Sequence, residues 1–140
     1  MKNKMGLNFL LSPEGFLKVG GAVLVLVAIL GFIGVIGPAT NSLFGSFWYF
    51  DNAENWAHLV LGVVGLIAAF AFPAAFNKIL VVVLGFIGVL VGLYSVLGSV
   101  PEGTNFLGAN LQNPADTLLH LVVGAWALVA GFKKGSSTTM

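Results

Sequence analysis

The sequence predicts an all-α protein, a bundle of four transmembrane helices, and three observations support this fold class. Hydrophobic residues make up 58% of the 140 residues and charged residues only 8%, whereas about a quarter of a soluble domain is charged. Four apolar segments are each long enough to cross about 30 Å of hydrocarbon. All six lysines fall on one side of the resulting four-span arrangement. The mean hydropathy of +1.00 agrees with a membrane protein.

The first segment covers about residues 13–37. Ser12, Pro13 and Glu14 are typical of an N-cap, a first-turn proline and an acid at the positive end of the helix dipole. The segment exceeds the roughly 7–15-residue core of a signal peptide, and further spans follow it, so we expect a retained helix. The other predicted helices cover about residues 53–72, 77–99 and 114–132.

Lysine placement predicts the orientation of the bundle. The lysines are Lys2, Lys4 and Lys18 around the start of the first span, Lys78 in the short turn between the second and third spans, and Lys133 and Lys134 after the fourth. The two longer loops, 38–53 and 100–113, contain none. Under the positive-inside rule, both termini are cytoplasmic and the protein is a multi-pass protein of the cytoplasmic (inner) membrane.

The second half of the chain repeats a pattern found in the first. The matching segments, 62 residues apart, are Ala53-Glu54-x-x-x-His58-Leu-Val-Leu-Gly62 and Ala115-Asp116-x-x-x-His120-Leu-Val-Val-Gly124. We therefore predict one membrane domain, residues 1–140, made of two tandem helix–loop–helix repeats at about 13–76 and 77–134, with a disordered tail at 135–140. Because each repeat has two spans, both copies have the same topology, related by a pseudo-two-fold axis along the membrane normal.

Each repeat places an acid, a histidine and small residues on one helix face. The residues are Glu54, His58, Gly62, Gly65 and Ala69 in the second span, and Asp116, His120, Gly124, Ala127 and Gly131 in the fourth. Steps of three and four residues keep each set on one face. The small residues predict close contact between helices, as do Gly85, Gly88 and Gly92 in the third span.

Two interpretations of His58 and His120 follow from their matched depth. In one, they face each other and ligate a haem, a chlorin or a metal ion, while Glu54 and Asp116 orient the imidazoles; in a related form, each acid–histidine pair titrates as a proton site. In the second, structural interpretation, Glu54 and Asp116 are ordinary first-turn residues of their helices. Asp51 or Asn52 is then the N-cap of the second span. We favour this structural interpretation, which predicts no cofactor.

The outer loop 44–50 is strongly aromatic, with the sequence Phe44-Gly-Ser-Phe47-Trp48-Tyr49-Phe50. Aromatic residues gather where a membrane meets water, so this loop predicts an interfacial belt in contact with the lipid bilayer. The alternative is a docking surface for a second copy of the chain or for a larger membrane complex.

Composition excludes several classes of function. The chain has no cysteine, which excludes disulfides and thiolate-ligated zinc or iron–sulfur clusters. It has no nucleophile–base pair and no basic patch, so we predict neither an enzyme nor a nucleic-acid-binding protein. The leading hypothesis is a structural or accessory subunit. The alternatives are a haem-, pigment- or metal-binding membrane protein using His58 and His120, and a small channel or transporter.

The repeated motif resembles a family of small four-helix bacterial membrane proteins that is grouped as a domain of unknown function. Its members carry His-Leu-x-x-Gly at the start of the second span and an Asn-x-Ala-Asp-x-x-Leu-His-Leu-like stretch at the start of the last. The corresponding segments here are Asn55-Trp-Ala-His58-Leu-Val-Leu-Gly62 and Asn113-Pro-Ala-Asp116-Thr-Leu-Leu-His120-Leu. The resemblance covers all four spans and implies their fold and topology, but it implies no activity.

Overall fold

The computed structural model describes residues 2–38, 40–97, 108–109, 111 and 114–133. The helices are α1 (Lys2–Leu10), α2 (Pro13–Phe32), the short 3₁₀ helix η1 (Gly45–Phe47), α3 (Asn52–Ala71), α4 (Ala74–Leu97) and α5 (Pro114–Phe132). The segments long and apolar enough to cross a membrane are Pro13–Phe32, Asn52–Ala71, Ala74–Val96 and Pro114–Phe132. The prediction of an all-helical architecture with four candidate spans is thus confirmed, and it indicates a membrane protein.

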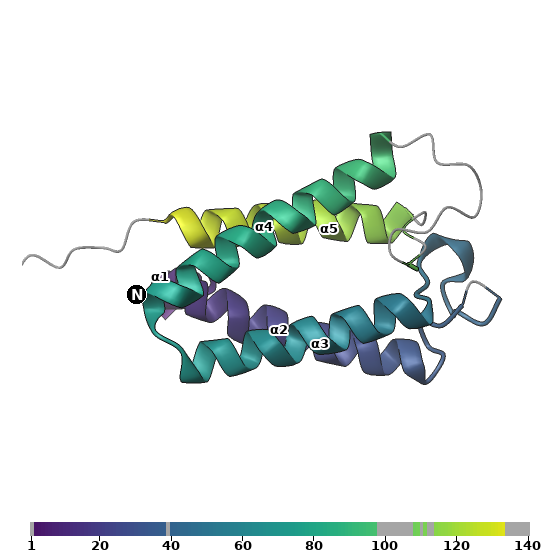
Figure 1. The fold of residues 1–140 in the computed structure, drawn as a ribbon, viewed down its shortest axis with the longest axis horizontal. Coiled ribbons are helices and arrows are strands. Elements are labelled where there is room, and N and C mark those ends of the chain that lie inside the picture. Colours follow the sequence, from purple (N-terminus) through teal and green to yellow (C-terminus); the bar gives the residue numbers. More distant parts are fainter. Residues whose placement is uncertain (1, 39, 98–107, 110, 112–113, 134–140) are drawn as a thin grey trace, which may run out of the picture.

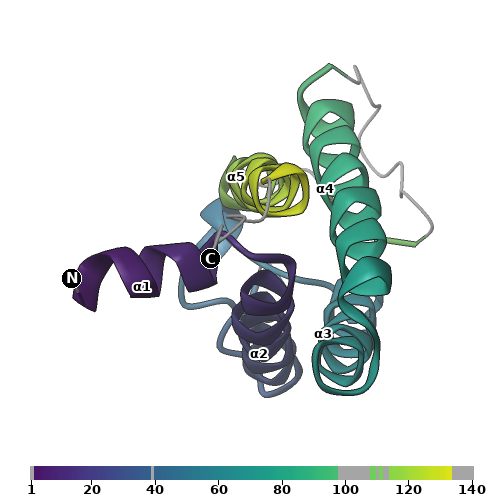
Figure 2. The same cartoon turned by 90° about the vertical axis from the view of Figure 1, so that its left-hand side faces the viewer.

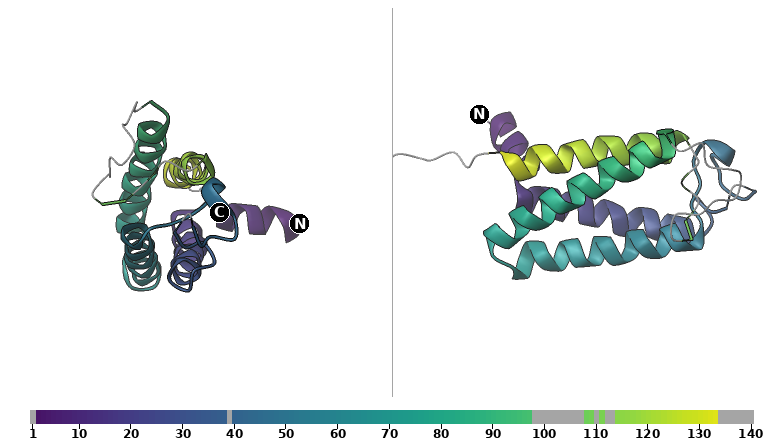
Figure 3. Two further views of the ribbon diagram at one scale, coloured as in Figure 1. Left: turned by 90° about the vertical axis from the view of Figure 1, so that its right-hand side faces the viewer. Right: turned by 45° about the horizontal axis from the view of Figure 1, so that its top comes forward.

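The four long helices form two antiparallel pairs, α2 with α3 and α4 with α5 (Figures 1 and 2). One end of the bundle, the lysine-rich end, holds Lys18, Lys78 and Lys133. The opposite end, the acid–histidine end, holds Glu54, His58, Asp116 and His120, and Figure 3 (left) views it along the bundle. The helices α3 and α4 are joined at the lysine-rich end and diverge toward the other end (Figure 1).

Glycines bring the backbones of each pair into direct contact. A Cβ on Gly62 of α3 would lie 2.8 Å from the carbonyl oxygen of Gly21 and 2.9 Å from the backbone nitrogen of Val25, both on α2. A Cβ on Gly124 of α5 would lie 2.6 Å from the backbone nitrogen of Val89 on α4. The other predicted packing glycines, which also lie against the partner helix of their own pair, are Gly65, Gly85, Gly88, Gly92 and Gly131.

An apolar core near the lysine-rich end joins the two pairs. Every span contributes to it through the buried residues Phe16, Leu17, Ala68, Ala69, Val81, Ala127 and Ala130. The ring of Phe16 also meets Trp126 edge to face, with centroids 4.7 Å apart, a geometry that aromatic pairs favour. The pairs are therefore held together mainly at the end where the chain begins.

The first span ends earlier than the sequence predicts. α2 stops at Phe32 rather than near residue 37. Gly34 adopts a φ of 86°, and the amide of Gly34 donates to the carbonyl of Gly31 while that of Val35 donates to Leu30. This is a Schellman arrangement, in which a glycine in the left-handed conformation ends a helix.

Other boundaries differ by a few residues. α4 begins at Ala74 instead of near residue 77, so Lys78 lies inside α4 and not in the turn that precedes it. The turn is short because the amide of Asn77 already donates to the carbonyl of Pro73, which makes the first helical bond of α4. α1 is not predicted at all. The predicted end of the third span at residue 99, Asn113 and the predicted tail at 135–140 lie outside the described residues.

The close approach in the α2–α3 pair predicts that Gly62→Ala destabilises the protein by about 1–3 kcal/mol, because the added methyl group must displace backbone atoms. Gly20→Ala is the matched control, since a Cβ on Gly20 would meet only the Phe16 ring, at 3.8 Å. We expect the control to stay within about 1 kcal/mol of the parent protein. Loss of helical circular dichroism during SDS titration of the protein in micelles measures both, and equal stabilities would contradict the packing described above.

Candidate functional site

The acid–histidine end begins with a capped helix start. The amide of Glu54 donates to Asp51 Oδ1, and the amide of Asp51 donates to Glu54 Oε2, both at 2.9 Å. This reciprocal pair is a capping box, which satisfies two of the free amides at the start of α3. Glu54 thus caps its own helix, as the structural interpretation predicts for this residue. The same carboxylate is only 2% exposed, so it also lies within the interior of the bundle.

The two histidines lie side by side although they come from different helix pairs. The ring centroids of His58 on α3 and His120 on α5 are 6.3 Å apart, and their planes are inclined by 34°. Both rings are partly buried. Asp116, which is 2% exposed, is close enough to interact electrostatically with Glu54 and His58. The fold therefore brings all four predicted site residues into one cluster.

His120 is oriented by its own helix. Its Nδ1 lies 2.9 Å from the backbone carbonyl oxygen of Asp116 and 3.3 Å from Asp116 Oδ2. Because a carbonyl oxygen can only accept, Nδ1 carries the hydrogen and donates it. The lone pair of the neutral ring is then on Nε2, which is the arrangement that a metal-ligating histidine usually has.

The ring of His58 is positioned by packing. Its ring lies against Phe50, with centroids 4.6 Å apart, and its Nδ1 is buried without a hydrogen-bond partner. Further buried polar atoms without such a partner at this end are Trp48 Nε1, Glu54 Oε1 and Asn55 Oδ1. Buried polar atoms in proteins are nearly always satisfied, so this concentration marks the cluster as a place where a polar ligand would gain hydrogen bonds or coordination.

Sequence reasoning missed two residues of this cluster. Asn55 is 2% exposed, and its Oδ1 occupies the space where a Cβ on Gly31 of α2 would be. It lies three residues before His58, so helical spacing could have placed both on one face. Phe50 precedes α3 and is also buried, with its amide donating to the carbonyl of Ile36 at 2.8 Å. No periodic signal marks a loop residue of this kind.

The aromatic outer loop is divided between the interior and the surface. Trp48 packs against Phe50, with centroids 5.9 Å apart, and against Phe44, at 5.2 Å. Ser42 Oγ donates to the Trp48 carbonyl oxygen at 2.6 Å, which closes the loop. Phe44 and Phe47 are exposed, the latter by 60%. One side of the loop thus supports the cluster, and the other side is free for lipid or protein.

The cluster contains two imidazoles as candidate ligands. In the described part of the chain, no three histidine, aspartate or glutamate side chains are grouped so that they could hold a metal ion together. Asp116 lies where it can orient His120, whereas Glu54 contacts Asp51; His58 and His120 are the side chains that could coordinate.

No protein-family model, curated protein sequence or solved structure matches this chain. The resemblance to the family with the repeated His-Leu-x-x-Gly motif stays a prediction.

The contact of Asn55 with Gly31 predicts a strong coupling between these positions. Gly31→Ala should destabilise the protein by about 1–3 kcal/mol, because the methyl group would overlap the amide of Asn55. In the double variant Gly31→Ala/Asn55→Ala that overlap is removed, so the two changes should be non-additive by about 0.5–3 kcal/mol. SDS titration of the single and double variants measures the coupling; strictly additive effects would mean that the side chain of Asn55 does not lie on α2.

Proposed function

We propose that this chain is a multi-pass protein of the cytoplasmic membrane with both termini in the cytoplasm, built from two tandem helical hairpins. The lysines at one end of the bundle support the orientation. The repeat is supported by the corresponding glycine contacts, because Gly62 lies against Gly21 and Val25 in one pair as Gly124 lies against Gly85 and Val89 in the other.

The orientation predicts which end of the protein is accessible from outside the cell. The chain has no cysteine, so single introduced cysteines are unique labels. Ser46→Cys in the exposed outer loop should react with a membrane-impermeant maleimide on intact cells, whereas Lys78→Cys should react only after the membrane is permeabilised. Both parent side chains are exposed, so the two sites are matched in accessibility. The reverse labelling pattern would show that the topology is opposite to the one proposed.

Within this framework, we propose that the acid–histidine end binds a metal centre between His58 and His120, either a transition-metal ion or the iron of a haem. The observation that carries this proposal is the 6.3 Å separation of the two ring centroids. Metal–imidazole bonds are about 2.0–2.1 Å long, so two imidazoles on opposite sides of one metal have centroids up to about 6.4 Å apart, whereas a tetrahedral ion would bring them closer together. The observed separation lies just inside this limit.

The surroundings of the histidines suit this chemistry. Imidazole is a preferred ligand of zinc, copper, iron and nickel. When its ring is neutral, His120 presents the Nε2 lone pair because Nδ1 donates to the Asp116 carbonyl, and the buried Nδ1 of His58 is available as a ligand atom. Ionisable residues within membrane helices are costly to keep there and are commonly functional. With two protein ligands, the remaining coordination positions would be filled by porphyrin nitrogens or by water.

A binding experiment tests the metal centre. The purified protein is titrated with Zn²⁺, Cu²⁺, Ni²⁺ and ferric haem, followed by calorimetry for the ions and by visible absorption for haem. One of these should bind at one equivalent per chain. His58→Ala and His120→Ala should each weaken binding by more than about 100-fold, since even the loss of a group that only orients a ligand costs about 10–100-fold. Asp116→Asn should weaken binding by about 10–100-fold.

The matched control is Trp56→Phe, which changes an exposed ring on the same turn of α3 and should leave the affinity unchanged. Circular dichroism confirms that each variant is folded. Binding that survives in the double variant His58→Ala/His120→Ala would refute the metal centre.

A second candidate function is a structural or accessory subunit that packs with itself or with a larger membrane complex. It is favoured by the capping box of Glu54, which gives one acid a structural role, and by the exposed rings of Phe44 and Phe47 on the outer loop. The two functions differ in the titration above: a protein that binds neither the ions nor haem, and whose stability is the same in both histidine variants, would favour the subunit.

A further inference from the structure

The N-terminal helix α1 lies across the lysine-rich end of the bundle. In the view along the spans, α1 runs across their direction and projects outward beside α2 and α5 (Figure 2). Figure 3 (right), in which the top of the molecule is turned forward, also shows α1 at this end of the bundle. A helix placed across the ends of membrane-spanning helices lies where the hydrocarbon meets water, in the plane of the membrane surface.

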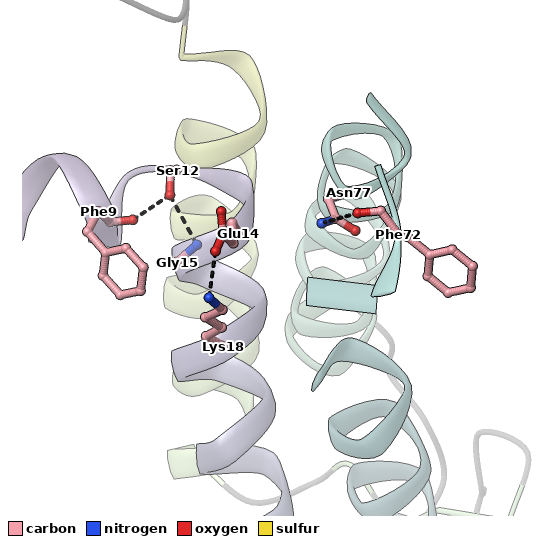
Figure 4. A network of polar contacts seen from close by, with 7 residues as sticks. All are labelled: Phe9, Ser12, Glu14, Gly15, Lys18, Phe72 and Asn77. Atoms are coloured by element: carbon pink, nitrogen blue, oxygen red, sulfur yellow. Dashed lines mark hydrogen bonds and ion pairs between the residues drawn. The ribbon is translucent and has the colours of Figure 1, made fainter. Parts of the chain in front are cut away.

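Hydrogen bonds at the C-terminal end of α1 fix this position. Trp126 Nε1 of α5 donates to the carbonyl oxygen of Leu10 at 2.8 Å. Ser12 Oγ donates to the Phe9 carbonyl oxygen at 2.7 Å and accepts from the amide of Gly15 at 3.0 Å, so the same hydroxyl ends α1 and caps α2 (Figure 4). The turn between the two helices is therefore held at three points.

One face of α1 is directed toward water. Lys133 Nζ donates to Asn8 Oδ1 at 2.8 Å. Lys133 follows the last span and lies seven residues beyond Trp126. Asn8 therefore faces away from the bundle, toward water. Lys4 is one helical turn before Asn8 and shares its face.

Apolar side chains on both flanks of this face are exposed. Met5, Leu7 and Phe9 are exposed by 75%, 57% and 43%. They belong to a helix whose C-terminal end is fixed by the hydrogen bonds described above. Met5 and Phe9 lie on one flank of the Lys4–Asn8 side and Leu7 on the other, so apolar side chains border the polar side, as in a helix that lies in the membrane interface.

Charge indicates the kind of lipid surface. Lys4, Lys18, Lys78 and Lys133 all lie at this end, and the acid there, Glu14, is already paired with Lys18 at 2.5 Å. An excess of lysine beside a membrane surface attracts anionic headgroups. We propose that α1 is an anchor helix that binds the surface of an anionic phospholipid membrane, with Met5, Leu7 and Phe9 inserted among the lipids and Lys4 among the phosphates.

Site-directed spin labelling tests this proposal on the full chain. Met5→Cys and Lys4→Cys, neighbours on different faces of α1, each carry one nitroxide after reconstitution into vesicles of phosphatidylcholine with phosphatidylglycerol. The label at position 5 should be reached by oxygen, which dissolves in lipid, nearly as well as a reference label at Leu26→Cys on the exposed side of α2. The label at position 4 should be reached mainly by a water-soluble nickel chelate.

Lipid charge and lysine charge provide the controls. In vesicles of phosphatidylcholine alone, the position-5 label should become several-fold more accessible to the nickel chelate. Adding Lys4→Gln to the Met5→Cys variant should reduce the equilibrium constant for insertion roughly fivefold in the anionic vesicles, and high salt should have a similar effect.

Two results would overturn the proposal. One is equal exposure of the two labels to the nickel chelate in anionic vesicles, which would mean that α1 stands in water. The other is identical oxygen accessibility at position 5 in neutral and anionic vesicles, which would mean that headgroup charge has no part in binding. Because Met5 is exposed and makes no packing contact that its replacement would remove, either result would concern α1 itself and not a failure to fold.

Discussion

Close backbone contact at glycine is the constraint on which both helix pairs depend. Lipid tails are as apolar as the side chains of these helices, so the hydrophobic effect does not drive the helices together. Close packing between the helices must stabilise their association instead. Gly62 against Gly21, and Gly124 against Val89, permit that distance because neither glycine has a side chain to hold the backbones apart. The large residues that surround these contacts, such as Val63 and Val123, are exposed on the outside of the pairs, where lipid can cover them.

The pairing of the helices also places the polar cluster. α3 and α5 each begin at the same end of the bundle, and each carries its acid and histidine within the first two turns. Once α3 is fixed on α2 and α5 on α4, and the apolar core joins the pairs at the opposite end, His58 and His120 meet. The buried ring of Phe50 completes this end by packing against His58. A single arrangement of backbones thus supports both the fold and the candidate metal centre.

The two ends of the molecule have different chemical characters. At the lysine-rich end, apolar side chains fill the space between the pairs, and α1 lies across the direction of the spans. At the acid–histidine end, carboxylates, an amide and two imidazoles take the place of that apolar core. Burial of such groups costs free energy unless they find partners. A requirement for stability alone does not explain the polar residues at the acid–histidine end. We therefore propose that the functional site lies there.

Much of this organisation was accessible from the sequence. Hydropathy identified the four candidate spans. The spacing of Glu54, His58 and Gly62 indicated that these residues share one helix face, because a helix has a regular period. Three features could not be obtained in this way. α1 is too short and too mixed in composition to stand out; Phe50 belongs to a loop without periodicity; and the end of α2 depends on the left-handed conformation of Gly34.

The sequence by itself therefore determined which segments are long and apolar enough to cross a membrane and which side chains share each helix face, since both follow from local composition and helical period. Only the tertiary structure decided which neighbour each face meets. It directs Gly62 toward α2 and Gly124 toward α4, and it brings His58 to 6.3 Å from His120. The physical reason is that such contacts join residues far apart in the chain, and they depend on how the helices pack together.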